Sequence, residues 1–223
     1  MSKIILVRHG ESTSNRDNIF TGWNDVPLTK KGFFQATEAG IKIKNSNIEF
    51  NEIHTSLLAR AIKTAYIIAD INGQSYLPIY KSWRLNERHY GALKGINKNK
   101  ARKIYGADQV ELWRRNFDAV PPSLNETSDD RRYDTIPRNI LPHCESLAMA
   151  LDRILVYFQD EMVPKLRKNQ NLLLVAHGST IRVLIKYFDQ ITGEELDGVI
   201  VENGDPIVYH FSKDLNIIDK INL

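Results

Sequence analysis

The sequence predicts a three-layer α/β/α sandwich, in which helices cover both faces of a mainly parallel, mixed β-sheet. Short apolar runs typical of buried strands alternate along the chain with stretches whose apolar residues recur at helical spacing. An apolar run that ends in His-Gly also occurs twice, at residues 6–10 and 174–178. Strands that alternate with helices usually pair in parallel, with the helices packed on the two faces of the sheet.

Five segments are predicted to be strands. Residues 3–7 form a continuous apolar run before Arg8-His9-Gly10, as expected of a strand that is covered on both faces. The other strands, in chain order, are expected at residues 52–56, 77–82, 172–176 and 207–211, and a short tail follows the last of them.

Helices are predicted between these strands. Thr29 is a candidate N-cap for the first helix, whose apolar residues lie on one face. Further helices are expected from about residue 58 to 69, at 107–115, from about 144 to 166 and from about 178 to 188. Pro164 lies near the end of the long helix and is expected to bend or stop it.

One domain is expected to span residues 1–223, because the chain has no linker and no repeat beyond the two His-Gly elements. A polar insertion near residues 123–140 is predicted to lie outside the core.

The composition excludes several classes of protein. A formal charge of +3 is too small for a typical nucleic-acid binder, and no apolar run approaches the length that spans a bilayer. The single cysteine, Cys144, cannot form an internal disulfide. We therefore expect a cytoplasmic protein with no nucleic-acid or membrane partner.

His9 and His177 follow the two apolar runs, so both are expected at the carboxyl edge of the sheet, where ligands bind in open α/β folds. A neutral imidazole can attack phosphorus, and a second, protonated histidine can stabilise the charge on the transferred group. The alternative is two unrelated histidines at strand ends. A metal site is disfavoured, because the sequence has no H-E-x-x-H motif and no carboxylate-rich loop to complete one.

Arg60 falls in the first turn of the helix after the second strand. A cation there opposes the helix dipole by roughly 0.3–1 kcal/mol, so a bound anion is the preferred explanation for this arginine. Arg114-Arg115 is ambiguous, because Glu111 precedes Arg115 by four residues and could form a plain helical ion pair.

Glu87 lies in a dense polar cluster soon after the third strand. It could be a general acid/base, or it could be the ion-pair partner of Arg88 or Lys94, and spacing does not decide between these. Lys98 alone is typical of a surface.

Together these residues resemble the cofactor-dependent phosphoglycerate mutases of the histidine phosphatase superfamily, over almost the whole chain. The opening Arg-His-Gly marks only the superfamily, whereas the Glu-Arg-His-Tyr-Gly segment points to the mutases. The matching motifs are Arg8-His9-Gly10-Glu11-Ser12-Thr13-Ser14-Asn15, Phe20-Thr21-Gly22-Trp23, Arg60-Ala61-Ile62-Lys63-Thr64, Asn86-Glu87-Arg88-His89-Tyr90-Gly91-Ala92-Leu93, Trp113-Arg114-Arg115 and Cys144-Glu145-Ser146-Leu147.

The resemblance implies a phosphoglycerate mutase-like catalytic domain that interconverts 2-phosphoglycerate and 3-phosphoglycerate. It assigns His9 as the phosphorylated nucleophile and Glu87 as the proton donor and acceptor, with Arg8, Arg60 and His177 around the transferred group. It also implies priming by 2,3-bisphosphoglycerate, no metal, and a possible homodimer. The residues implied to hold the substrate are Ser12, Asn15, Thr21, Gly22, Tyr90, Lys98, Arg114, Arg115, Gly178 and Ser179.

Two departures from the family pattern are visible. Ser179-Thr180 follows His177-Gly178 where the family usually has Asn-Ser, so a hydroxyl must replace an amide. Asn203-Gly204 stands where the family usually has Thr-Gly. The competing functions are a small-molecule phosphatase on the same fold and a non-catalytic phosphate-binding protein.

Overall fold

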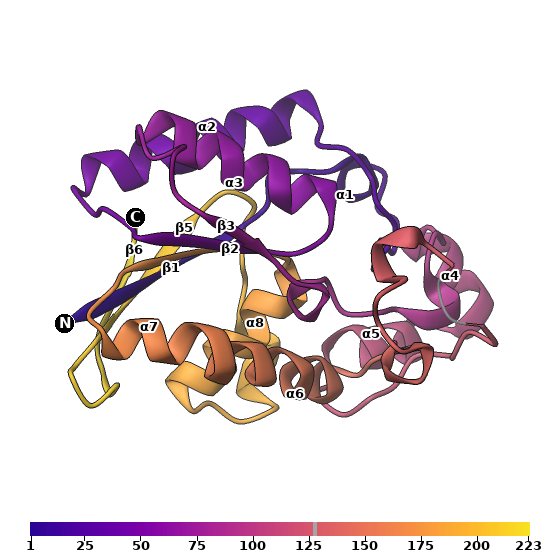
Figure 1. Cartoon of the computed structure of the whole chain (residues 1–223). Helices are drawn as coiled ribbons and strands as arrows, with labels where there is room; N and C mark the ends of the chain where they lie inside the picture. The colour runs from indigo at the N-terminus through magenta and orange to yellow at the C-terminus, as the bar shows by residue number, and fades with distance from the viewer. Residues whose placement is uncertain (127–128) are drawn as a thin grey trace.

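A six-stranded mixed sheet forms the centre of the computed structural model, which describes residues 1–126 and 129–223 (Figure 1). The strand order is β3-β2-β4-β1-β5-β6. The first four strands in this order pair in parallel with their neighbours, whereas β5 pairs antiparallel with both β1 and β6. The mainly parallel mixed sheet is therefore confirmed. The strands are β1 (Ser2–Arg8), β2 (Glu52–Thr55), β3 (Ile79–Lys81), β4 (Leu172–Ala176), β5 (Pro206–Phe211) and β6 (Ile217–Asn222).

Helices cover both faces of this sheet, as the sequence predicts (Figure 1). Helices α2 (Lys30–Asn45) and α3 (Ala59–Ile71) cover one face, and α6 (Leu147–Tyr157), α7 (Val163–Arg167) and α8 (Gly178–Asp189) cover the other. Side chains of β1 alternate between two apolar clusters. Ile5 and Val7 pack under α2 and α3, while Ile4 and Leu6 pack against α6 and α8.

A third group of helices lies beyond the carboxyl end of β1 (Figure 1). It comprises α1 (Thr13–Arg16), α4 (Lys98–Tyr105) and α5 (Ala107–Arg115). Short 3₁₀ turns occur at Trp83–Leu85, Gly91–Leu93, Arg131–Tyr133, Arg138–Ile140 and Glu195–Gly198. These helices and turns surround the edge of the sheet at which the parallel strands end.

Local chemistry explains where the first long helix begins. The Thr29 hydroxyl accepts a hydrogen bond from Gly32 N at 3.0 Å, which confirms the predicted N-cap of α2. The sequence analysis missed α1, α4 and β6. Strand β6 is exposed at every residue, so it has no alternation of buried and exposed side chains that a pattern could reveal.

The long helix predicted for residues 144–166 begins later and is interrupted. Ser146 is its N-cap, and a π-helical turn, Phe158–Met162, separates α6 from α7. Pro164 has no N–H to donate, and its ring would crowd the carbonyl four residues earlier. The wider turn accommodates this proline, which bends the helix and does not stop it.

The polar insertion near residues 123–140 lies off the sheet, but it is not wholly outside the core. Tyr133 and Leu141 are buried with Trp23 and Trp83 in a separate apolar cluster. The Tyr133 hydroxyl also accepts a hydrogen bond from Asn86 Nδ2 at 3.0 Å. The prediction of a solvent excursion was wrong for these residues, because one aromatic side chain anchors an otherwise polar stretch. Thr127 and Ser128 lie in this segment, outside the described residues.

His54 is a buried histidine on β2, away from the strand ends. Its Nδ1 lies 2.9 Å from the Tyr157 hydroxyl, and its ring stacks on Tyr80. Burial, with a smaller effect from nearby Lys165, lowers the pKa of His54 to about 4. The neutral ring is therefore the folded form at physiological pH.

This burial makes a prediction about stability and pH. Unfolded His54 takes up a proton below its ordinary pKa of about 6.5, whereas folded His54 does so only near 4. The unfolded state therefore binds more protons in this window, and the free energy of unfolding should fall as pH decreases from 6.5 to 4. One such group contributes about 1.4 kcal/mol per pH unit.

Urea denaturation of wild type and of His54→Gln between pH 4 and 7 measures this contribution. Glutamine does not titrate and can still reach Tyr157, so the variant should lose stability less steeply on acidification. Parallel pH profiles for the two proteins would contradict the assignment.

Candidate active site

Three adjacent strands end at one place and bring the predicted histidines together. Arg8 pairs with Ala176 in the register of β1 and β4, so His9 and His177 leave neighbouring strands side by side. His9 N donates to Ala176 O at 3.0 Å. The two ring centroids lie 5.0 Å apart in an edge-on arrangement. The meeting of two histidines that are distant in sequence is therefore confirmed.

The His9 ring is held in a defined protonation state. Its Nδ1 donates to Gly10 O at 2.7 Å, and Arg60 Nε donates to its Nε2 at 3.2 Å. Burial, followed by the charges of Arg60 and Arg8, keeps the pKa of His9 well below its usual value. The ring is therefore neutral, with the proton on Nδ1 and a lone pair on Nε2.

Arg60 is buried in the first turn of α3, not exposed. Besides His9, its guanidinium donates to Gly22 O at 2.9 Å and to Asn24 O at 2.8 Å. Burial lowers the pKa of Arg60 to about 10, which still leaves it charged at neutral pH. Backbone carbonyls thus solvate a cation that has no ion-pair partner among the described residues.

His177 is fixed from the third strand end. Its Nε2 lies 2.7 Å from Ser56 Oγ, directly after β2, and Leu58 N donates to the same hydroxyl at 3.1 Å. Burial, followed by the charges of Arg60 and His9, lowers the pKa of His177 well below its usual value. Burial and the nearby cations thus disfavour the protonated form of this ring, and protonation of the second histidine stays a prediction for the bound state.

Within residues 1–126 and 129–223, two buried side-chain nitrogen atoms next to the histidines have no hydrogen-bond partner. They are His177 Nδ1 and Arg8 Nε, although Arg8 Nη1 donates to Val201 O at 2.7 Å. A buried donor without an acceptor is costly, at roughly 1–3 kcal/mol. An oxyanion bound between them would satisfy both groups.

The glycines after the two histidines serve different contacts. A Cβ on Gly10 would lie 2.0 Å from Gly32 O, so this glycine lets the loop pack directly on the start of α2. A Cβ on Gly178 would lie 3.3 Å from Arg8 Nε, which is a tight contact with a pocket side chain. Close approach is thus required at both positions, but at Gly10 the approaching group is the protein's own backbone.

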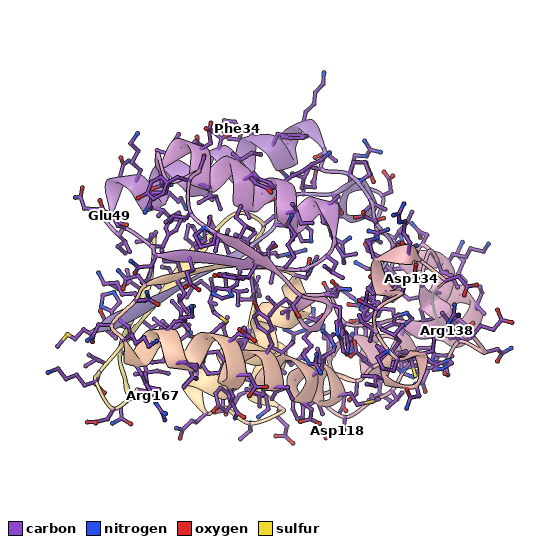
Figure 2. All side chains as sticks on the ribbon, viewed as in Figure 1. Phe34, Glu49, Asp118, Asp134, Arg138 and Arg167 are labelled. Carbon is purple, nitrogen blue, oxygen red and sulfur yellow. The ribbon has the colours of Figure 1, made fainter. Side chains whose placement is uncertain are left out.

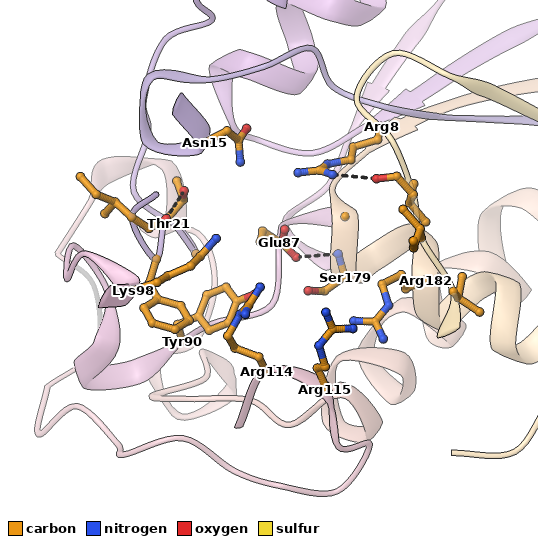
Figure 3. Close-up of a pocket in the computed structure, with 17 residues that line it drawn as sticks. Arg8, Asn15, Thr21, Glu87, Tyr90, Lys98, Arg114, Arg115, Ser179 and Arg182 are labelled. Carbon is orange, nitrogen blue, oxygen red and sulfur yellow. Dashed lines mark hydrogen bonds between the residues drawn. The ribbon is translucent and has the colours of Figure 1, made fainter. Parts of the chain in front are cut away.

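Glu87 points its carboxylate into a pocket in front of the histidines (Figure 3). Its Oε1 accepts from Arg88 N at 2.9 Å and from Ser179 N at 3.1 Å. Neither Arg88 nor Lys94 forms an ion pair with it among the described residues, so the ion-pair interpretation is not supported.

A buried ion pair supports the loop that carries Glu87. Arg153 Nε donates to Glu145 Oε1 at 2.6 Å, and Glu145 Oε2 accepts from His89 N at 2.8 Å. Arg153 Nη1 also donates to Arg84 O at 2.6 Å. The pair thus connects both flanks of Glu87 to α6.

The pocket itself has a volume of about 230 Å³, which suits a small molecule. Five cationic side chains face it against one carboxylate, so the pocket favours an anion. Its lining includes the predicted residues Arg8, Asn15, Thr21, Gly22, Glu87, Tyr90, Lys98, Arg114, Arg115, Gly178 and Ser179.

Arg114 and Arg115 fit both roles considered for them, a place at the ligand pocket and an ion pair with Glu111 on the same helix. Each lines the pocket, and each also contacts Glu111, at 2.8 Å for Arg114 and 3.3 Å for Arg115. Lys98 lies on the pocket wall and not on open surface, and burial lowers its pKa.

Some predicted residues lie away from the pocket wall. His9, Arg60 and His177 are buried next to it. Ser12 is buried as the N-cap of α1 and exchanges hydrogen bonds with Asn15. Ser12 therefore orients Asn15, and its direct contact with a ligand stays a prediction.

The sequence analysis missed three residues at this site. Ser56 is the last residue of a predicted strand, so the rule that located both histidines at strand ends could have found it. Arg182 lies one turn after Gly178 on α8 and lines the pocket. Asn203, noted only as a departure from the family, donates its amide to His9 O at 2.6 Å.

Within residues 1–126 and 129–223, no three His, Cys, Asp or Glu side chains gather closely enough to hold a metal ion. Over the same residues, no helix is long and apolar enough to cross a membrane.

Comparison with known proteins identifies relatives over the full length. Residues 4–223 match the family described as histidine phosphatase superfamily (branch 1). A 2,3-bisphosphoglycerate-dependent phosphoglycerate mutase 2 of Lactobacillus johnsonii is 52% identical over 221 residues, which cover 99% of this chain and 96% of the relative. The 2,3-bisphosphoglycerate-dependent phosphoglycerate mutase of Staphylococcus saprophyticus is 43% identical over 228 residues, with full coverage of both chains.

Solved structures share the fold at lower identity. The phosphoglycerate mutase of Bacillus anthracis has a TM-score of 0.70 at 24% identity, covering 97% of this chain and 90% of its own. The alpha-ribazole phosphatase of Shigella flexneri has a TM-score of 0.72 at 19% identity, covering 99% and 96%. The sheet, the paired histidines and the full-length relatives agree, and the chain belongs to branch 1 of the histidine phosphatase superfamily, within the family of 2,3-bisphosphoglycerate-dependent phosphoglycerate mutases.

Proposed function

We propose that this protein interconverts 2-phosphoglycerate and 3-phosphoglycerate through a phosphohistidine on His9, primed by 2,3-bisphosphoglycerate. The observation that carries the proposal is the state of His9. Gly10 O fixes its proton on Nδ1, so Nε2 presents a lone pair beside Arg60 and His177 in a cation-lined pocket. The names of the full-length relatives support the same activity.

In the proposed reaction, His9 Nε2 gives and takes a phosphoryl group. Phospho-His9 transfers the group to the free hydroxyl of the bound monophosphate, so the P–N bond breaks, a P–O bond forms, and the Nε2 lone pair is restored. Glu87 takes the proton from that hydroxyl. When His9 then attacks the other phosphate of the bisphosphate, Glu87 returns the proton to the departing oxygen.

The groups around His9 are expected to stabilise the phosphoryl group in the transition state of its transfer. Arg8 Nε, Arg60 and His177 Nδ1 are the donors available to its oxygens, and two of them, Arg8 Nε and His177 Nδ1, have no hydrogen-bond partner among the described residues. The incoming negative charge offsets the repulsion from the arginines, so it favours the protonated form of His177 at that moment.

The wall beyond Glu87 is proposed to hold the remainder of the glycerate. Asn15, Thr21, Gly22 and Tyr90 provide polar contacts there, and Lys98, Arg114 and Arg115 provide positive charge. Gly178 and Ser179 stand at the start of α8, where Ser179 N already holds Glu87. A hydroxyl in place of the usual amide at residue 179 is compatible with this contact, because the backbone makes it.

We further propose that the chain is a single catalytic domain in the cytoplasm. Both apolar clusters on the sheet draw on segments from the beginning and the end of the chain, which supports one folding unit. The one cysteine, Cys144, has no partner for a disulfide, which fits a reducing compartment.

A homodimer is proposed through the β3 edge of the sheet. Tyr80 on β3, Tyr66 on α3 and nearby Tyr76 are exposed, and an exposed edge with aromatic side chains favours pairing with another chain. Sedimentation of wild type should give about twice the chain mass of 25.6 kDa.

Tyr76→Glu should shift this population toward the monomer, because a buried unpaired carboxylate opposes association. Phe34→Glu is the matched control, since Phe34 is also an exposed aromatic residue but lies on α2 (Figure 2). A monomeric wild type would contradict the dimer.

The nucleophile is tested by covalent labelling. Brief incubation with 2,3-bisphosphoglycerate should give one acid-labile phosphoryl adduct in the intact mass, and His9→Ala should abolish it. His210→Ala is the control, because His210 pairs with Lys3 at the opposite end of β1. Labelling that survives His9→Ala would remove His9 from the mechanism.

Glu87→Gln tests the proton transfer. Glutamine keeps the shape and can still accept from Ser179 N, but it cannot take a proton. Turnover should therefore fall roughly 10²–10⁴-fold, while the dissociation constant for 3-phosphoglycerate stays close to that of wild type. Unchanged turnover in a coupled assay would reject Glu87 as the acid/base.

The same assay separates the mutase from a phosphatase. Isomerisation of 3-phosphoglycerate should depend on added 2,3-bisphosphoglycerate and should exceed the release of inorganic phosphate. Phosphate release much faster than isomerisation would assign the site to phosphatase chemistry.

A further inference from the structure

The cations on the pocket wall are not equivalent. Arg114 and Arg115 share the carboxylate of Glu111, and Arg115 also contacts Asp197 at 3.0 Å. Their positive charge is therefore partly compensated before any ligand arrives, although Arg102 shares the same Glu111 carboxylate. Arg8, Lys98 and Arg182 form no ion pair within the described parts of the chain, so these three side chains carry the uncompensated charge of the pocket.

Arg182 also has a donor to spare. Its Nη2 donates to Leu196 O at 2.7 Å, but its Nε is buried and has no hydrogen-bond partner in the part of the chain that the structure describes. Figure 3 shows the guanidinium beside that of Arg115, on the wall that faces Glu87. A half-buried cation next to another cation, with an unused N–H, lacks an acceptor that an anionic ligand would provide.

The helix places this side chain at a defined depth. Gly178 and Ser179 begin α8 at the histidines, and Arg182 follows one turn further along the same helix. A helix rises about 1.5 Å per residue, so the backbone of Arg182 lies about 6 Å further along α8 than that of Gly178. This offset is about the length of a three-carbon acid. Arg182 is thus positioned for the end of the substrate that does not react.

We propose that Arg182 binds the anionic group of the substrate that lies farthest from His9, a carboxylate or the second phosphate of a glycerate. This assignment rests on the proposed function, and it adds a binding residue that separates ligands with two anionic ends from ligands with one. Arg8 Nε and His177 Nδ1 serve the first end, and Arg182 Nε serves the second.

The alternative role for Arg182 is structural. Through Leu196 O it holds the Glu195–Gly198 turn, which Arg115 also holds through Asp197 O at 3.1 Å. A tether of this kind would affect every ligand of the pocket alike. A direct contact affects only ligands that reach Arg182.

The test compares a ligand with two anionic ends against a ligand with one. Dissociation constants of 2,3-bisphosphoglycerate and of orthovanadate are measured by calorimetry for wild type and Arg182→Met, which removes the charge but keeps the apolar stem. Loss of a charged hydrogen bond should weaken bisphosphoglycerate binding on the order of 10- to 100-fold. Vanadate, which occupies only the His9 end, should bind within about twofold of wild type.

Arg167→Met is the matched control, because it removes the same charge from an exposed site on α7, remote from the pocket (Figure 2). It should leave both constants unchanged. Arg182→Lys should recover part of the bisphosphoglycerate affinity through its charge. If Arg182→Met has a lowered melting temperature, the same two dissociation constants are compared between wild type and Arg182→Lys.

Equal weakening of both ligands, or of neither, would overturn the assignment of Arg182. The proposed function fails separately: wild type that binds bisphosphoglycerate but shows no mutase turnover contradicts that function alone. Wild type with mutase turnover and an unchanged constant in Arg182→Met contradicts the Arg182 assignment alone.

Discussion

Buried positive charge at the carboxyl edge of the sheet is the constraint on which the rest of the structure depends. Arg60 is almost fully inaccessible, yet it remains charged and contacts the His9 ring. Taking a guanidinium out of water is costly unless acceptors replace the water. The carbonyls of Gly22 and Asn24 supply them, and the same bonds fix the loop that walls the pocket. The Arg60 guanidinium therefore connects the loop at Gly22 and Asn24 to the nucleophile His9.

The residues that hold the Glu87 loop in place act mainly through hydrogen bonds to its backbone. Glu145 and Arg153 form a buried pair whose remaining hydrogen bonds go to main-chain groups around Glu87. Such a pair adds little net stability by itself, but breaking it would leave an unpaired buried charge. Its value lies in holding one conformation of a loop with little regular structure, so that the carboxylate of Glu87 meets Ser179 N at the start of α8.

The sequence revealed those parts of the site that strand ends determine. Apolar runs before His9 and His177 located both rings, because parallel strands end at the same edge of a sheet. Spacing could not place Glu87, whose position depends on contacts with distant Arg153 and Trp23. The π-turn before Pro164 and the exposed strand β6 were missed for a related reason. Neither leaves a periodic pattern, and each is set by packing or pairing with the remainder of the fold.

Asn203 closes the site from the far end of the chain. Its amide donates to His9 O, and Gly204 N donates to Arg8 O, so the end of the first strand is completed by residues that come much later in the chain. Strand β4 also lies between β1 and β2, although both of these strands precede it by more than a hundred residues. Such long-range pairings form slowly compared with local contacts. A chain in which β4 and Asn203 have not yet paired with β1 consequently carries the reactive histidine without its surroundings, so the site forms only with the complete sheet.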